Sequence, residues 1–157
     1  MARRAVARRT VARSTGVRIT RSELGAWLLR CNPSNNPAVT ELAGTGGRIS
    51  QWCVVRNYRS AMIAGGDRAL LWVSGNGRLL VRGIWGAGFV TAPARPAATG
   101  GLTVAVDIPL LTAAVTDEEL RAQGIDDLEV QLQPMGSNPS WVSKADYSRL
   151  QPLLGGH

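Results

Sequence analysis

The side chains of this sequence best suited to a specific interaction are its five tryptophans. Two of them, Trp52 and Trp72, stand on either side of the turn Gly65-Gly66-Asp67. A tryptophan either fills a hydrophobic core or offers a flat wall to a planar ligand. Trp52 follows the polar, glycine-rich segment GTGGRISQ, which favours a pocket wall over a position inside a strand. Trp72 lies within the apolar run RALLWVS, which is typical of a core strand.

The other three tryptophans lie in three different settings. Trp27 opens a predicted strand and is interpreted as structural. Trp85 could form a second pocket wall or fill the core, and the sequence leaves both open. Trp141 lies in the segment GSNPSW, where we interpret it as an exposed loop residue that could cover a pocket mouth. Ser74, at the end of the strand that holds Trp72, could face the same pocket.

The residues of acid–base, nucleophilic and metal chemistry are sparse. The single histidine is His157, and the two cysteines, Cys31 and Cys53, form no CxxC pair. No cluster that could bind zinc and no Ser/His or Cys/His couple is present. Asp67 is the one carboxylate in a conspicuous motif, and an aspartate there usually forms the turn. We therefore expect a protein that is not an enzyme and binds no metal or cofactor, with reduced thiols as in the cytoplasm.

The net charge of +7 is confined to one end of the chain. Residues 1–21 contain seven arginines and no acidic residue, whereas residues 22–157 contain eleven basic and eleven acidic residues. We predict a disordered basic arm over residues 1–21 and one domain over residues 22–157. The arm could contact phosphates through Arg3, Arg4, Arg8 and Arg9, or it could be an idle extension. No apolar run approaches the roughly 20 residues that span a membrane.

Short strands dominate the pattern of the domain. We predict strands in AWLLRC (26–31), RALLWVS (68–74), RLLVRGIWGAGFVTA (78–92), GLTVAVDIPLL (101–111) and LEVQLQP (128–134), with a tight hairpin at residues 75–77. Capping residues predict short helices after Thr116 and Ser143. Gly83, Gly86 and Gly88 indicate bulges or close backbone approach, as in a small barrel. These features predict an α+β fold, a small curved β-barrel of about five to seven strands with short peripheral helices.

Four segments, in order, resemble an EVE domain: AWLLRCNP (26–33), WCVVRNYRSAMIAGGDRALLWVSG (52–75), GIWGAGFV (83–90) and LQPMGSNPSWVSKADYSRL (132–150). The resemblance implies a PUA-like barrel related to YTH and ASCH domains. It also implies recognition of a modified base in DNA or RNA, taken into an aromatic-walled pocket. The chain departs from the family pattern at residues 34–36, where relatives carry an aromatic residue, and at Trp85. These departures affect the identity of the expected ligand more than the expected fold.

The resemblance also suggests the residues of the site. It aligns Trp52 with a cage tryptophan of YTH modules, and it implies main-chain contacts from Arg30 and Cys31. The amide of Asn32 could bind a base edge, or it could form an Asx turn before Pro33. Ser137 and Asn138 form a second polar loop that could reach the ligand. Three arginines could hold phosphates around the mouth or be solvated surface charges: Arg56, Arg59 and Arg78.

Two further functions remain open at this point. The chain could be a general RNA-binding PUA-like module without selectivity for a modification, or it could bind a nucleoside-like small molecule. Equal competition by an unmodified oligonucleotide would indicate the first. A free nucleoside that binds as tightly as an oligonucleotide would indicate the second. The oligomeric state, monomer or weak dimer, is left open by the sequence.

Overall fold

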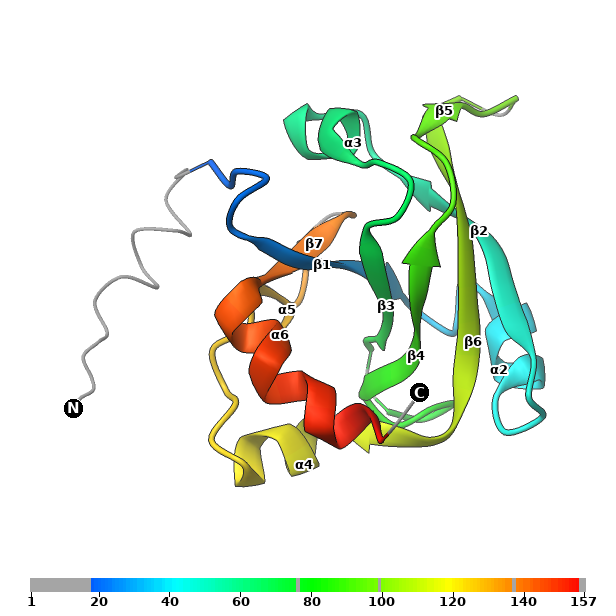
Figure 1. Cartoon of the computed structure of the whole chain (residues 1–157). Helices are drawn as coiled ribbons and strands as arrows, with labels where there is room; N and C mark the ends of the chain where they lie inside the picture. The colour runs from blue at the N-terminus through cyan, green and yellow to red at the C-terminus, as the bar shows by residue number, and fades with distance from the viewer. Residues whose placement is uncertain (1–17, 76, 99, 137, 156–157) are drawn as a thin grey trace.

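A mixed seven-stranded sheet forms the framework of the computed structural model, which describes residues 18–155 except 76, 99 and 137. The strand order is β2-β6-β4-β3-β1-β7, with β5 paired to β6. The strands are β1 Leu24–Cys31, β2 Arg48–Val54, β3 Arg68–Val73, β4 Gly83–Val90, β5 Arg95–Pro96, β6 Leu102–Thr116 and β7 Ser140–Ser143. Figure 1 shows how strand direction changes across the sheet, from the upright β6, β4 and β3 to the transverse β1 and β7.

The α+β class is confirmed, but the sheet is not a closed barrel. β2 and β7 stand at its two ends, and no pairing joins them among the described residues. The pair β1 and β3 is parallel, and all other neighbours are antiparallel. Since parallel neighbours run in the same direction, the carboxyl ends of β1 and β3 lie at one edge of the sheet.

Both faces of the central strands are buried. In β1, Trp27 and Leu29 belong to one hydrophobic cluster, whereas Ala26 and Leu28 belong to a second cluster. The first cluster lies among the strands and includes Val104 and Ile108 of β6, and the second is covered by the helical segments. Strands covered on both faces read as continuous apolar runs rather than alternating ones. This explains why the segments of β1 and β3 predict strands so clearly.

The helical segments are short: α2 Pro37–Leu42, α3 Tyr58–Met62, α4 Asp117–Ala122, α5 Glu129–Leu132, α6 Lys144–Leu150 and the 3₁₀ turn η1 Gln151–Leu154. The predicted caps are confirmed, since Thr116 forms a capping box with Glu119 and Ser143 accepts a hydrogen bond from the Asp146 N–H. None of the helices among the described residues is long and apolar enough to cross a membrane.

The predicted strand over residues 128–134 is wrong, because α5 occupies most of it. The Gln131 side chain accepts a hydrogen bond from the Leu128 N–H at 2.9 Å and donates to the Ile125 carbonyl oxygen at 2.9 Å. These local bonds close a helical turn. Leu128 and Val130 are both buried in that turn, so the apolar alternation is satisfied without a strand.

The connection between β3 and β4 also differs from the prediction. The two strands are antiparallel neighbours, but β4 begins only at Gly83, so residues 74–82 form a long connection instead of a tight hairpin. Within β4 the predicted close approach is confirmed, since a Cβ added at Gly88 would overlap the Asp107 carbonyl group of β6. One added at Gly86 would lie 2.7 Å from the Ile108 side chain.

Residues 18–21, at the end of the predicted arm, contact the folded part. The guanidinium of Arg18 lies 3.9 Å from the centre of the Tyr58 ring, and Ile19 is buried in the first cluster. Arg21 forms an ion pair with Asp67 at 2.7 Å. The rest of the predicted arm, including Arg3, Arg4, Arg8 and Arg9, lies outside the described residues.

Candidate ligand-binding site

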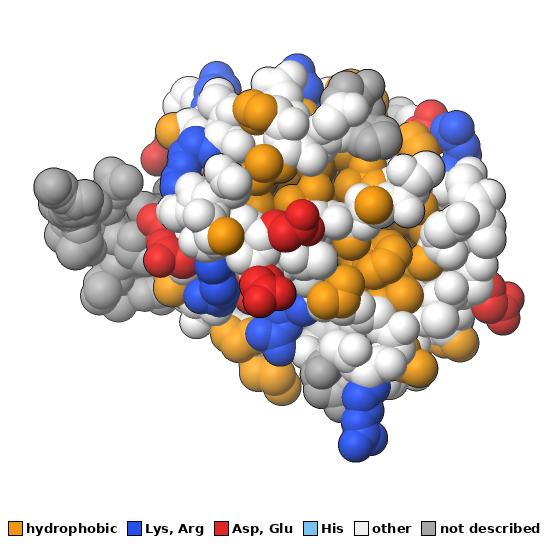
Figure 2. Space-filling view, turned by 90° about the horizontal axis from the view of Figure 1, so that it is seen from below, with side chains coloured by type: hydrophobic (Ala, Val, Ile, Leu, Met, Phe, Trp, Pro, Cys, Tyr) orange, Lys and Arg blue, Asp and Glu red, His pale blue; other side chains and the backbone are white. Residues whose placement is uncertain are grey.

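Two adjoining pockets lie beyond the carboxyl ends of β1 and β3. The larger has a volume of about 750 Å³ and the smaller about 470 Å³, and both are lined by Asn32, Ser74 and Gly75. Volumes of this size suit a small ligand or one unit of a polymer. The connection between β3 and β4 lies at the lower end of Figure 1. Figure 2, which views that end, shows hydrophobic side chains gathered around a hollow.

Parallel pairing explains why Asn32 and Ser74 meet although they are far apart in the sequence. The register pairs Cys31 with Val73, so the residues that follow leave the sheet together. The Ser74 N–H and hydroxyl both donate to the Cys31 carbonyl oxygen, at 2.8 and 3.2 Å. Cys31 itself is buried, and burial raises the pKa of its thiol to about 12. Its contribution to the site is therefore its main chain.

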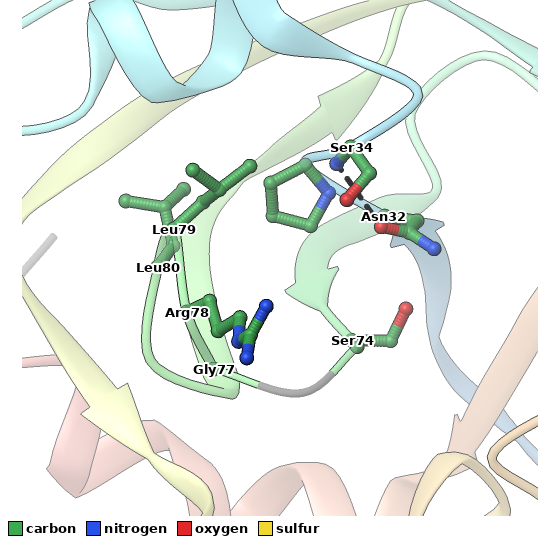
Figure 3. A pocket seen from close by; sticks show the side chains of 9 residues that line it. Asn32, Ser34, Ser74, Gly77, Arg78, Leu79 and Leu80 are labelled. Carbon is green, nitrogen blue, oxygen red and sulfur yellow. Dashed lines mark hydrogen bonds between the residues drawn. The ribbon is translucent and has the colours of Figure 1, made fainter.

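Asn32 is exposed at the shared wall of the two pockets, and it adopts the Asx turn that the sequence left as an alternative. Its Oδ1 accepts a hydrogen bond from the Ser34 N–H at 3.1 Å, and its main-chain oxygen accepts from the Asn35 N–H at 2.9 Å. The amide nitrogen makes no hydrogen bond to any described residue. Asn32 therefore presents a donor to a ligand, while its acceptor is engaged by the turn (Figure 3).

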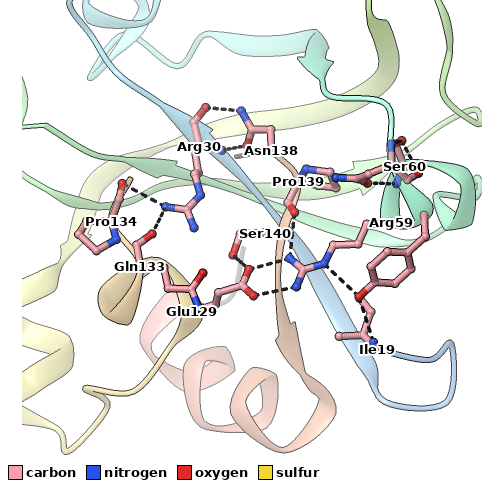
Figure 4. A network of polar contacts seen from close by, with 12 residues as sticks. Ile19, Arg30, Arg59, Ser60, Glu129, Gln133, Pro134, Asn138, Pro139 and Ser140 are labelled. Atoms are coloured by element: carbon pink, nitrogen blue, oxygen red, sulfur yellow. Dashed lines mark hydrogen bonds and ion pairs between the residues drawn. The ribbon is translucent and has the colours of Figure 1, made fainter. Parts of the chain in front are cut away.

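Asn138 lines the larger pocket, but its amide is engaged by the main chain of Arg30. Oδ1 accepts from the Arg30 N–H at 2.5 Å, and Nδ2 donates to the Arg30 carbonyl oxygen at 3.1 Å (Figure 4). The same carbonyl oxygen accepts from Nε1 of Trp52 at 3.1 Å. These bonds fix the pocket wall, so Asn138 and Trp52 position the site. Ser137, which was predicted to reach the ligand together with Asn138, lies outside the described residues.

The side chain of Arg30 is the part of the site that the sequence interpretation missed. The residue is 8% exposed and lines the larger pocket. Nη1 donates to the main-chain oxygens of Gln133 and Pro134 at 2.8 and 3.3 Å, while the buried Nε has no hydrogen-bond partner among the described residues. Burial lowers the pKa of Arg30, against the opposing charge of Glu129. An arginine inside the apolar run AWLLRC was the signal available in the sequence.

Arg59, predicted as a phosphate contact, is engaged in an ion pair instead. Its two terminal nitrogens donate to the two carboxylate oxygens of Glu129 at 2.7 and 2.8 Å, and the Ser140 hydroxyl donates to the same carboxylate at 2.7 Å (Figure 4). Both charged side chains are less than one-fifth exposed. Burial tends to raise the pKa of Glu129, but the hydrogen bonds and charge of Arg59 outweigh it and lower that pKa.

Two of the tryptophans, Trp52 and Trp141, are arranged differently from the prediction. Trp52 lies inside β2, paired with Val104, and does not line either pocket. The expectation of an exposed Trp141 is wrong, because it lies in β7 with 6% of its surface exposed. Trp85 packs against the first cluster and donates to the Val81 carbonyl oxygen at 2.8 Å. Trp72 is a core residue as predicted, at 1% exposure, and it also reaches the larger pocket.

Besides the shared wall, the smaller pocket is lined by Pro33, Ser34, Gly77, Arg78, Leu79 and Leu80. In Figure 3 the two leucines lie across the pocket from Asn32 and Ser74, and the Arg78 side chain projects between these two sides. Arg56 is exposed and lines neither pocket.

Every ionisable group in the described lining that is charged at neutral pH is an arginine. Arg30 and Arg82 line the larger pocket and Arg78 the smaller, with no aspartate or glutamate in either. Arg82 is held by a hydrogen bond to the Gly75 carbonyl oxygen at 2.7 Å. Within the described residues, no three His, Cys, Asp or Glu side chains group as metal ligands would. The site is therefore suited to a ligand with negative charge or hydrogen-bond acceptors.

Three solved structures have a similar fold. Protein PSPTO5229 from Pseudomonas syringae is 18% identical with a TM-score of 0.57, and the match covers 82% of this chain and 99% of that chain. Rpa0253 from Rhodopseudomonas palustris is 22% identical with a TM-score of 0.59, covering 85% and 94%. Atu2648 from Agrobacterium tumefaciens is 21% identical with a TM-score of 0.56, covering 83% and 92%. No protein-family model and no curated protein matches the chain.

Proposed function

We propose that the protein is a non-enzymatic module that binds a modified base of DNA or RNA in the larger pocket and a neighbouring backbone phosphate in the smaller one. One observation supports this most strongly: the two pockets share the wall formed by Asn32, Ser74 and Gly75, and only arginines supply charge to them. A nucleotide needs such a pair of neighbouring sites, one for a planar base and one for a phosphate.

The larger pocket has groups that suit a base. Asn32 offers an amide donor to its edge, Trp72 and Val130 contribute apolar surface, and Asn138 holds the wall in place. Because Trp72 is almost fully buried, it forms the floor rather than a broad stacking surface. Base binding here depends on edge hydrogen bonds and enclosure more than on an aromatic cage.

The smaller pocket suits the backbone. Arg78 would contact a phosphate, and Leu79 and Leu80 would pack against the sugar. Extrusion of a base from a duplex costs a few kcal/mol, so phosphate contacts must offset that cost. We further propose that the fold is of the EVE type and PUA-like, and that the protein acts in the cytoplasm.

A titration of the tryptophan fluorescence of the full chain tests the proposal, because one of its five tryptophans, Trp72, lines the larger pocket. The probes are short oligonucleotides that contain methyladenine, methylcytosine, hydroxymethylcytosine or no modification, each at two salt concentrations. Asn32→Asp retains the acceptor of the Asx turn but removes the amide donor. Asn35→Asp, with the same change of charge at the rim of the larger pocket, is the matched control.

We expect one modified strand to bind best, with Asn32→Asp weakening it by roughly tenfold and Asn35→Asp by much less. Equal, salt-sensitive binding of all strands would instead establish a general nucleic-acid-binding module. A free nucleoside that binds as tightly as its oligonucleotide would indicate a small-molecule binder. Failure of every strand to bind would refute the proposal.

The phosphate contact is tested separately with Arg78→Gln. Arg95 of β5 is exposed and lines neither pocket, so Arg95→Gln is a control with the same loss of charge. Arg78→Gln should weaken the binding of all strands alike. It should also reduce the dependence of affinity on salt concentration by about the amount expected for one phosphate contact. Equal effects of the two variants would exclude the smaller pocket as the backbone site.

A further inference from the structure

The polar cluster behind the larger pocket carries an imbalance of charge. Arg30 and Arg59 both lie near Glu129, and the carboxylate is engaged by Arg59 in a two-point ion pair. Arg30 is buried and forms no ion pair among the described residues, with main-chain oxygens as its partners. These three side chains, which are buried or half-buried, therefore carry one net positive charge. A buried charge without a counterion is costly, so such a group is expected to serve a ligand.

Arg30 lines the larger pocket, and its guanidinium is only partly satisfied by hydrogen bonds. Its Nε is buried without a hydrogen-bond partner among the described residues, and Nη2 donates to none of them either. Gly136 also lines this pocket and lies against the guanidinium, since a Cβ added there would lie 2.6 Å from Nη2. The adjacent Nε and Nη2 of a guanidinium form the planar pair of donors that a carboxylate accepts in two parallel hydrogen bonds.

We propose that the larger pocket is selective for a base that carries a carboxylate group on its ring, and that the guanidinium of Arg30 binds this carboxylate. This rests on the proposed function and names the class of modification. A methyl or hydroxymethyl group would leave the buried guanidinium unpaired, whereas a carboxylate would supply its missing counterion. The described lining contains no Asp or Glu that would repel the carboxylate, and Glu129, which lies near Arg30, is already paired with Arg59.

The test compares ligands on the unaltered full chain before any variant is used. The probes are one oligonucleotide with 5-carboxylcytosine at a single position, the same strand with the carboxamide of that group, and the same strand with 5-methylcytosine. The carboxamide has the same shape without the charge. We expect the carboxylate strand to bind at least about tenfold more tightly than the carboxamide strand. Equal binding of the two would overturn the proposal.

Two variants then assign the preference to Arg30. Arg30→Gln should abolish the difference between carboxylate and carboxamide strands, while Arg30→Lys, which retains the charge but not the planar fork, should retain only part of it. Gly136→Ala should reduce the preference without removing any charge, because its Cβ displaces Nη2. If Arg30→Gln fails to fold, the comparison of ligands and the Gly136→Ala variant still test whether Arg30 binds the carboxylate. An unchanged preference in folded Arg30→Gln would refute the assignment.

The remaining outcomes separate this inference from the proposed function. If the methylcytosine strand binds as well as the carboxylate strand, the pocket still takes a modified base, and only the acidic selectivity is refuted. If no strand binds, both proposals fail together. Orotate, a free pyrimidine carboxylate, and acetate, a carboxylate without a ring, are added as competitors. Competition by orotate and not by acetate supports a ring-borne acid, whereas equal competition by acetate would overturn it in favour of a simple anion site.

Discussion

The side-chain amide of Asn138 forms hydrogen bonds with both main-chain polar groups of Arg30, at 2.5 and 3.1 Å. The neighbouring strand β7 begins at Ser140, which pairs with Leu28 of β1. The amide therefore continues the pairing of β1 past the first residue of β7, as a further strand residue would do. This contact connects the segment that precedes β7 to the strand that carries the buried arginine.

Removal of this amide should loosen the pocket and destabilise the protein. Asn138→Ala leaves the Arg30 N–H without a partner among the described residues, so we expect a loss of about 1–3 kcal/mol in the free energy of unfolding. Urea denaturation measures it. Asn35→Ala, at an exposed position, is the control and should cost little. Similar losses in the two variants would show that the amide bridge contributes nothing to stability.

The Arg59–Glu129 ion pair should be important for stability because its charges are partly buried. Glu129→Gln leaves two arginines near one another without their shared carboxylate. We expect a loss of about 3 kcal/mol. The free energy of unfolding is compared with that of Glu41→Gln, an exposed glutamate with no ion pair to the described residues. A loss of unfolding free energy no larger than that of Glu41→Gln would contradict a stabilising role for the Arg59–Glu129 ion pair.

Asp67 should make stability dependent on acid pH. Burial tends to raise the pKa of its carboxyl group, but hydrogen bonds from Arg21, Trp27 and Ala64 outweigh it, so the pKa in the folded state is lowered. Stability from such a group is present above its unfolded pKa of about 4 and is lost as pH falls through the folded pKa.

Asp67→Asn measures this contribution. The difference in unfolding free energy between wild type and variant should be constant above about pH 5 and should shrink in more acidic solution. Asp126→Asn, at an exposed position, serves as the control with the same chemical change. A difference that grows on acidification would have the wrong sign and would reject this account.

The two thiols should differ sharply in reactivity. Cys31 is buried with a pKa raised to about 12, whereas Cys53 is exposed. At pH 8, a thiol reagent such as Ellman's reagent should rapidly modify Cys53 alone, and both cysteines should react in denaturant. Cys53→Ser should abolish the rapid reaction. Rapid modification of Cys31 in the folded protein would contradict its burial.

Much of the framework could be predicted from local pattern. The apolar runs of β1 and β3, the caps at Thr116 and Ser143 and the core position of Trp72 depend on a few neighbouring residues, so the sequence indicates them directly. The segment of α5 could not be assigned this way. Its short apolar alternation fits a strand or a turn, and the Gln131 side chain decides between them through contacts that no periodicity reveals.

By itself, the sequence determined the class of fold, the scarcity of catalytic residues, and Asn32 and Ser74 as site candidates. Only the tertiary structure decided which residues meet. The parallel pairing of β1 with β3 brings Asn32 beside Ser74, burial removes Trp141 from any pocket mouth, and Glu129 engages Arg59 but not Arg30. A charge becomes available to a ligand only when its neighbours leave it unpaired. Gln133 and Asn138, which form hydrogen bonds with Arg30, lie more than a hundred residues away from it along the chain.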